Sequence, residues 1–188
     1  MEQRLNDGWL FAKLPNGSTP EDAGRAEFKP VDLPHDWLIW QAENLYESAD
    51  AWYIRKLNIP DGDLYCRILR FDGVYMDCDV LVNGKVIFTH PYGYTAFFVP
   101  LDGAVRQGEN ELTVHIRFRS PNSRWYSGSG IYRDVTLLSL PPNHLVPDGI
   151  SLKTEEDEAG IWSVQIAAET AGDDGIPFLC EADRKSVV

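Results

Sequence analysis

The sequence is poor in cysteine, and the cysteines that it has form no recognisable motif. Cys66, Cys78 and Cys180 are odd in number and widely separated, and no Cys-x-x-Cys pair occurs. A disulfide framework needs paired cysteines, and a zinc site built on thiolates needs closely spaced ligands, so neither is indicated. We expect reduced, partly buried thiols and no metal site.

Basic residues and long apolar runs are also scarce. The chain carries 17 Lys and Arg against 29 Asp and Glu, a formal net charge of −12, without the basic patch that a nucleic-acid partner would need. No apolar run approaches the roughly 20 residues that span a bilayer, and the N-terminus lacks a basic region followed by an apolar core. We therefore expect no nucleic-acid or membrane partner, and a cytoplasmic location unless a leader has been removed.

Helical periodicity is hard to find, whereas alternation typical of strands is common. Hydrophobic residues make up 44% of the 188 residues, which excludes disorder, and 15 glycines with 12 prolines favour short elements joined by turns. Leu112, Val114, Ile116 and Phe118 alternate with polar residues, which is typical of an antiparallel sheet with one wet face. Asn83-Gly84 predicts a tight hairpin, because both residues tolerate positive φ.

About eight such strands, without a long helix, predict an all-β fold in which residues 1–140 form a jelly-roll-type antiparallel β-sandwich. Residues 15–25 are expected to form an exposed loop, and Phe28–Trp40 a loop or edge strand, because Pro34 lacks a backbone donor. The predicted strands lie within Leu5–Leu14, Ala51–Ile59, Leu64–Phe71, Val74–Val82, Lys85–Thr89, 95–99, Glu111–Phe118 and Ile131–Leu138.

A second unit is predicted from residue 141 onwards. Pro141-Pro142 gives a stiff extended link, and three strand-like segments follow it, Gly149–Thr154, Ile161–Glu169 and Ile176–Ala182. Three strands cannot close an immunoglobulin-like sandwich of about seven. Residues 141–188 are therefore expected to be a linker and the incomplete start of such a domain, either a piece of something longer or a tail that packs on a partner.

The candidate functional loop is Arg124-Trp125-Tyr126, beside the glycine-rich stretch Ser127–Gly130. Aromatic faces stack on the C–H-rich faces of pyranose rings and a guanidinium donates to hydroxyls, so the loop predicts sugar contact. The alternative is a packing role, in which the aromatic rings plug one end of the sandwich.

His35-Asp36 invites comparison with a catalytic relay. Adjacent residues of an extended chain point in opposite directions, however, and no Gly-x-Ser-x-Gly motif supplies a nucleophile. A local hydrogen-bonded turn is the favoured interpretation.

Nine short segments occur in a fixed order over roughly residues 5 to 140. They are Leu5–Trp9, Val31–Trp37, Ala51–Lys56, Phe71–Val74, Val82–Lys85, Gly93–Thr95 with Phe97, Pro100-Leu101, Gly108–Asn110 and Ser123–Val135. In this order they resemble the N-terminal region of the family two glycoside hydrolases, the group of β-galactosidases, β-glucuronidases and β-mannosidases.

The resemblance implies a jelly-roll sugar-binding domain, then an immunoglobulin-like domain, then a catalytic TIM barrel. It implies a retaining mechanism with two barrel glutamates whose carboxyls lie roughly 5 Å apart, and no cofactor. A barrel takes about 250 residues, and nothing here corresponds to it. We therefore expect this chain to be inactive alone and to need the missing barrel. The parent enzyme, monomeric or homo-oligomeric, is expected to be a β-galactosidase that acts on β-linked oligosaccharides or galactosides.

By the same resemblance, Arg124 and Trp125, with Tyr126 and Asp36 beside them, are expected to contact the sugar at the rim of the barrel pocket. Some family members carry an acidic residue in this loop that helps to bind a monovalent cation; Arg124 stands there in this sequence, so that site is not expected. Two alternatives stay open: a stand-alone carbohydrate-binding module, and a structural domain that docks on a barrel without touching sugar.

Overall fold

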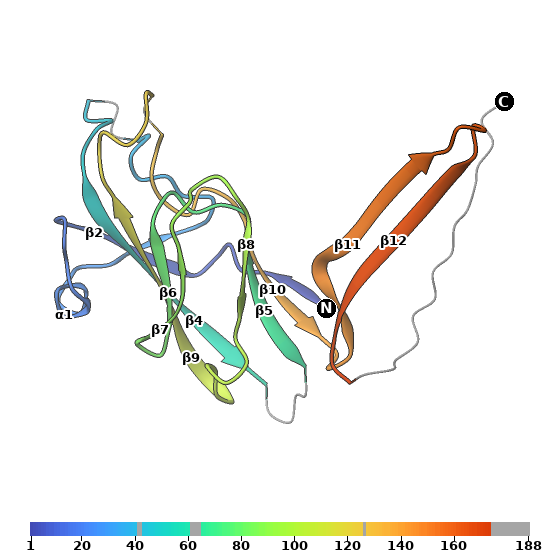
Figure 1. Ribbon diagram of the computed structural model, residues 1–188. Coiled ribbons are helices and arrows are strands. Elements are labelled where there is room, and N and C mark those ends of the chain that lie inside the picture. Colours follow the sequence, from blue (N-terminus) through green and yellow to red (C-terminus); the bar gives the residue numbers. More distant parts are fainter. Residues whose placement is uncertain (41–42, 61–64, 126, 174–188) are drawn as a thin grey trace. The chain divides into compact units, whose positions relative to one another are not determined.

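Figure 1 shows the computed structural model, which describes residues 1–40, 43–60, 65–125 and 127–173. The chain divides into two compact units, Met1–Ser139 and Leu140–Val188. Both are built from antiparallel strands, so the predicted all-β class is confirmed. The only helix in the described residues has four residues, and none of the described helices could cross a membrane.

The first unit contains a six-stranded sheet centred on two long strands, β4 and β9, which pair over their whole length. The residues Asn83 and Gly84 have φ values of 50° and 78°, and the hairpin predicted from them joins β6 to β7. The strands follow in the spatial order β3 (Lys29–Val31), β2 (Trp9–Leu14), β4 (Ala49–Ile59), β9 (Gly108–Phe118), β6 (Cys78–Val82) and β7 (Lys85–His90).

A four-stranded sheet completes the first unit, and one continuous hydrophobic core draws side chains from both sheets. Leu112, Val114 and Ile116 of β9 are fully buried, as the alternation predicted. They share the core with Leu69 and Val99 of the smaller sheet. Burial of each such side chain stabilises the fold by roughly 1.5–3 kcal/mol. The smaller sheet has the order β1 (Glu2–Arg4), β10 (Val135–Leu140), β5 (Cys66–Phe71) and β8 (Phe97–Pro100).

Two predicted strands begin four residues later than expected. β6 starts at Cys78 and not at Val74, because the chain turns at Asp77, which has a φ of 52°. β10 starts at Val135 and not at Ile131. In both cases the residues before the strand belong to loops that contact each other, since Tyr75 forms an isolated β-bridge with Gly130.

The stretch expected to be a plain loop, residues 15–25, contains the helix α1 (Pro20–Ala23). Thr19 caps it reciprocally: its hydroxyl accepts a hydrogen bond from the Asp22 N–H at 3.3 Å, and the Asp22 carboxylate accepts one from the Thr19 N–H at 2.9 Å. The sequence signal was Thr-x-x-Asp, with an acid in place of the more usual Glu or Gln. The short strand β1 was also not predicted.

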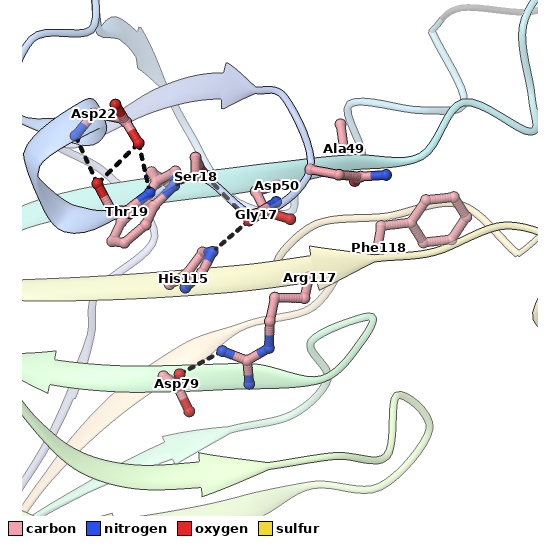
Figure 2. A network of polar contacts seen from close by, with 12 residues as sticks. Gly17, Ser18, Thr19, Asp22, Ala49, Asp50, Asp79, His115, Arg117 and Phe118 are labelled. Atoms are coloured by element: carbon pink, nitrogen blue, oxygen red, sulfur yellow. Dashed lines mark hydrogen bonds and ion pairs between the residues drawn. The ribbon is translucent and has the colours of Figure 1, made fainter.

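A buried carboxylate fixes this loop to the outer face of the large sheet (Figure 2). Asp50 is fully buried, and its Oδ2 accepts a hydrogen bond from the Gly17 N–H at 3.1 Å and lies 3.1 Å from His115 Nε2. Its Oδ1 accepts a hydrogen bond from Arg119 at 2.7 Å. A buried carboxylate is tolerated because each oxygen has a partner.

The described part of the second unit is one long hairpin of β11 (His144–Glu156) and β12 (Trp162–Ala171). Two of the predicted strands, Gly149–Thr154 and Ile161–Glu169, fall within or close to these two strands, whereas Ile176–Ala182 and Cys180 lie outside the described residues. One face of the hairpin is apolar and exposed. It comprises Ile150, Leu152, Trp162, Val164 and Ile166, which are 47% to 68% exposed.

Candidate functional site

The glycine-rich stretch after the predicted sugar-contact loop is held along one side by the residues that follow Pro34. The N–H of His35 donates to the Ile131 carbonyl at 2.8 Å, and the N–H of Trp37 donates to the Ser129 carbonyl at 3.0 Å. Two segments about ninety residues apart therefore lie side by side at one end of the first unit. This pairing fixes the base of the loop.

The opposite side of the stretch is held by Tyr75. Gly130 and Tyr75 exchange two backbone hydrogen bonds of 2.9 and 3.0 Å. Gly130 has a φ of 143°, and a Cβ there would lie 2.2 Å from the His35 carbonyl oxygen and 2.7 Å from the Tyr53 hydroxyl. Only glycine fits where the backbone is enclosed so tightly.

Asp36 organises the loop base through a single oxygen. Its Oδ1 accepts hydrogen bonds from the N–H groups of Leu38 at 3.0 Å, Ile39 at 3.1 Å and Ser129 at 2.9 Å. The predicted local turn is confirmed, and the third bond extends it to the glycine-rich stretch. Since Oδ1 is occupied in this way, Asp36 is placed to position the loop; its predicted contact with sugar stays a prediction.

The fully buried Tyr53 and the half-buried His35 form a hydrogen-bonded pair beneath this base. Tyr53 is fully buried, and its hydroxyl lies 2.7 Å from His35 Nδ1. Burial raises the pKa of Tyr53 well above its usual value, against the opposing effect of the Ile131 backbone N–H. Burial also lowers the pKa of His35, although the nearby Asp36 carboxylate opposes this. Sequence reasoning missed this pair, because nothing in the alternation of β4 distinguishes Tyr53 from a core residue.

The tip of the loop, by contrast, is open to solvent. Trp125 is 72% exposed, and the Arg124 guanidinium lies over its ring, 5.6 Å from the centroid. The Ser123 hydroxyl donates to the Trp125 carbonyl and closes a tight turn. The alternative in which Trp125 plugs the sandwich is therefore wrong. Tyr126 lies outside the described residues.

Two further exposed aromatic rings lie close to the loop. Tyr92 and Tyr94 are 55% and 56% exposed, with ring centroids 5.7 Å apart. Tyr94 packs edge-on against Tyr75 at 5.2 Å, and the Tyr75 hydroxyl donates to Asn122 in the loop at 3.4 Å. These contacts connect the two groups of rings. We call Tyr92, Tyr94, Arg124 and Trp125 together the aromatic rim.

A sequence profile described as "Glycosyl hydrolases family 2, sugar binding domain" matches residues 5–141. The chain belongs to glycosyl hydrolase family 2. The match covers nearly all of the first unit, including the whole loop and its supports.

Among curated family 2 relatives, a β-galactosidase of Bacteroides ovatus is 36% identical over 157 residues, which is 75% of this chain and 18% of that protein. A putative β-glucuronidase of Formosa agariphila is 28% identical over 185 residues, which is 92% of this chain and 18% of that protein. The chain thus spans about a fifth of the length of these relatives and corresponds to their N-terminal part.

Solved structures agree. A β-glycosidase from Bacteroides vulgatus superposes with a TM-score of 0.75 at 25% identity, covering 93% of this chain and 24% of that one. A calcium-binding mutant of Bacteroides uniformis β-glucuronidase 2 gives a TM-score of 0.77 at 26% identity, covering 92% of this chain and 22% of that one. The predicted relationship to the N-terminal region of family 2 is confirmed. The relatives carry the names of both β-galactosidases and β-glucuronidases, so the family alone leaves the sugar undecided.

Proposed function

We propose that this chain is the non-catalytic N-terminal part of a retaining β-glycosidase, and that it contributes the aromatic rim to the substrate pocket of the parent enzyme. The observation that supports the proposal is the difference between the fixed base and the exposed tip of one loop. Its base is held by Asp36, Trp37 and Tyr75, whereas Arg124 and Trp125 at its tip are exposed. Pre-organised, solvent-facing groups on a rigid base are typical of binding residues.

For the sugar, we propose a terminal β-linked galactose. The curated β-galactosidase of B. ovatus, at 36% identity, supports this choice. A β-glucuronide is the second candidate, because a curated β-glucuronidase of Bacteroides fragilis is 33% identical over 154 residues. The exposed rim suits either sugar, since ring stacking depends on C–H faces that both pyranoses share.

We further propose that residues 1–140 form the sugar-binding-type domain of jelly-roll kind, and that residues 141–188 begin an immunoglobulin-like domain. The apolar face of the β11–β12 hairpin supports the second part. An exposed row of large apolar side chains on one face of a sheet indicates a surface that is covered in the complete domain. Further strands of the same polypeptide are the occupant that we propose.

The test is kinetic and uses the full-length parent enzyme with chromogenic β-galactoside and β-glucuronide substrates. We expect Arg124→Ala and Trp125→Ala each to lower kcat/KM more than about tenfold, which is about 1.4 kcal/mol of transition-state stabilisation. Arg25→Ala, a second exposed arginine next to α1, is the matched control and is expected to change nothing. Wild-type kinetics in both rim variants, with unchanged folding, would leave the domain a scaffold only.

The alternative of a stand-alone carbohydrate-binding module is tested separately. Such a module needs no barrel, so the 188-residue chain would bind galactosides through the rim, with an affinity that Trp125→Ala abolishes. Calorimetry on the isolated chain and on this variant distinguishes the two functions.

A further inference from the structure

The loop that carries Arg124 and Trp125 leaves the large sheet at the end of β9. The ladder between β4 and β9 ends at the pair Ala49 and Phe118. Residues 119–122, which we call the entry segment, then lead from the last paired residue to the exposed tip of the loop. The direction of the entry segment is set by side-chain contacts, because the ladder has ended before it begins.

Arg119, the first residue of the entry segment, is fixed to a buried carboxylate. Its Nη1 lies 2.7 Å from Asp50 Oδ1, 2.8 Å from Asn16 Oδ1 and 2.9 Å from the Phe118 carbonyl oxygen. The Asp50 side chain is 1% exposed, whereas that of Arg119 is 45% exposed. A hydrogen bond between two charged groups is stronger than one between neutral groups, so this contact holds Arg119 against β4.

Asp50 is itself held from other directions, by the loop before α1 and by β9 (Figure 2). Its Oδ2 lies 3.1 Å from the Gly17 nitrogen, 3.3 Å from the Ser18 hydroxyl and 3.1 Å from His115 Nε2. The His115 ring stacks on Trp52, with centroids 3.9 Å apart. An apolar residue often stabilises a core as well as a buried ion pair does, so stability alone does not explain a carboxylate here. Asp50 provides a fixed anchor for Arg119.

The rest of the entry segment is held in the same manner. The Ser120 N–H donates to the Ser48 hydroxyl oxygen at 2.8 Å, and the Ser48 hydroxyl lies 3.4 Å from the Ser120 carbonyl oxygen. Asn122 accepts the hydrogen bond of 3.4 Å from the Tyr75 hydroxyl. The chain is therefore held from the end of β9 as far as Asn122, directly before the tip.

We propose that Arg119 is a positioning residue for the tip of the loop, through which the fixed position of Asp50 is passed on to Arg124 and Trp125. Side chains that are ordered in advance lose less entropy when they bind, so a loose entry segment weakens every contact that the tip makes. The effect on catalysis rests on the proposed function. The effect on the order of the loop does not.

The first experiment measures backbone order in the 188-residue chain by nitrogen-15 relaxation. In Arg119→Ala we expect the order parameters of residues 123–125 to fall from about 0.8 to below about 0.6, which is the range of flexible backbone. Arg119→Lys is expected to preserve most of the order, because a lysine ammonium can replace the single nitrogen that makes the three contacts.

Arg55→Ala is the matched control for this measurement. Arg55 also lies on β4, donates to the Asp7 carbonyl at 2.8 Å and pairs with the Asp7 carboxylate at 3.2 Å. Neither contact involves the entry segment. The variant loses an arginine and its ion pair, and it is expected to leave the order parameters of residues 123–125 unchanged.

The second experiment is a mutant cycle in the full-length parent enzyme. Arg119→Ala is expected to lower kcat/KM about fivefold, and Arg119→Lys less than about twofold. When Arg124→Ala and Trp125→Ala are already present, Arg119→Ala is expected to lower kcat/KM by less than about twofold more, because the residues through which it acts are gone. A role in stability alone would give the same factor in both backgrounds.

Three outcomes would overturn the proposal. They are unchanged order parameters in Arg119→Ala, an equal loss of order in Arg55→Ala, and an equal loss of kcat/KM in both backgrounds. The proposed function fails by a different result, which is wild-type kinetics in Arg124→Ala and Trp125→Ala. The order parameters would then still decide whether Arg119 positions the loop.

Discussion

Asp36 and Ser129 are joined by a hydrogen bond of 2.9 Å from backbone N–H to side-chain oxygen, although 93 residues separate them in the sequence. The same oxygen accepts two further N–H groups from its own turn. One carboxylate therefore couples the turn after Pro34 to the loop that carries Arg124 and Trp125. The position of the rim depends on a residue for which the sequence had indicated a local turn and a sugar contact, but no bond to the distant loop.

The first prediction concerns this carboxylate. Asp36→Ala leaves three backbone N–H groups without their acceptor, and we expect the free energy of unfolding to fall by about 2–4 kcal/mol. Asp36→Asn keeps an oxygen at the same place and is expected to lose only about 1 kcal/mol. Urea denaturation followed by tryptophan fluorescence measures both. Equal losses in the two variants would show that the hydrogen bonds are not what Asp36 contributes.

The second prediction compares two glycines with nearly the same backbone conformation. Gly8 and Gly128 have φ values of 70° and 67°, but a Cβ on Gly8 meets nothing within 4 Å, whereas one on Gly128 would lie 1.9 Å from Asp36 Oδ2. Gly8→Ala is expected to cost about 1 kcal/mol for the left-handed conformation. Gly128→Ala is expected to cost about 2 kcal/mol more, because it displaces a fixed carboxylate. Similar melting temperatures for the two variants would contradict this.

The third prediction is a loss of stability in mild acid. Burial lowers the pKa of His35 and of His115 below the usual 6.5, against the opposing effects of Asp36 on the first and chiefly Asp50 on the second. As the pH falls below about 6.5, the unfolded chain takes up protons that the folded chain does not, so the free energy of unfolding decreases until the pH passes through the folded-state pKa values. Urea titrations at about pH 7.5 and about pH 5.5 measure this difference.

The variant His115→Asn measures how much of this loss of stability in acid comes from His115. His115→Asn removes one titrating group and leaves an amide next to Asp50, so its loss of stability between the two pH values is expected to be smaller than that of the wild type. A loss of the same size in the variant would exclude His115 as a contributor.

The fourth prediction concerns thiol reactivity. Cys78 is fully buried, and burial raises the pKa of its thiol to about 12. At about pH 8 its thiolate fraction is then about a thousandfold below that of an ordinary cysteine, and the reagent has no access to it. Iodoacetamide is expected to spare Cys78 in the folded chain and to label it in urea, as peptide mass spectrometry would show. Rapid labelling of Cys78 without denaturant would contradict the structure.

The sequence predicted the strands well where one physical signal dominated. Alternation placed Leu112, Val114, Ile116 and Phe118 in the core, and two residues tolerant of positive φ placed the hairpin at Asn83-Gly84. It failed where contacts between distant segments decide the conformation. Val74 to Asp77 has the composition of a strand, yet Tyr75 pairs with Gly130, and this keeps the segment outside β6.

The candidate site divides in the same way. The exposed tip, Arg124 and Trp125, could be recognised from residue types and from the family resemblance. Its supports could not, because the acceptor role of Asp36, the buried hydroxyl of Tyr53 and the enclosure of Gly130 arise from residues far apart in the chain. The alternation of polar and apolar residues along one strand carries no information about contacts between residues that are far apart in the sequence.

The glycine-rich stretch is held by hydrogen bonds on both sides, so the residues that fix the position of the loop are not the residues at its tip. Its anchors are mostly main-chain hydrogen bonds and one carboxylate, none of which involves the side chains of Arg124 or Trp125. Evolution, or a protein engineer, can therefore exchange the two tip residues to suit a different glycoside while the surrounding framework retains its geometry.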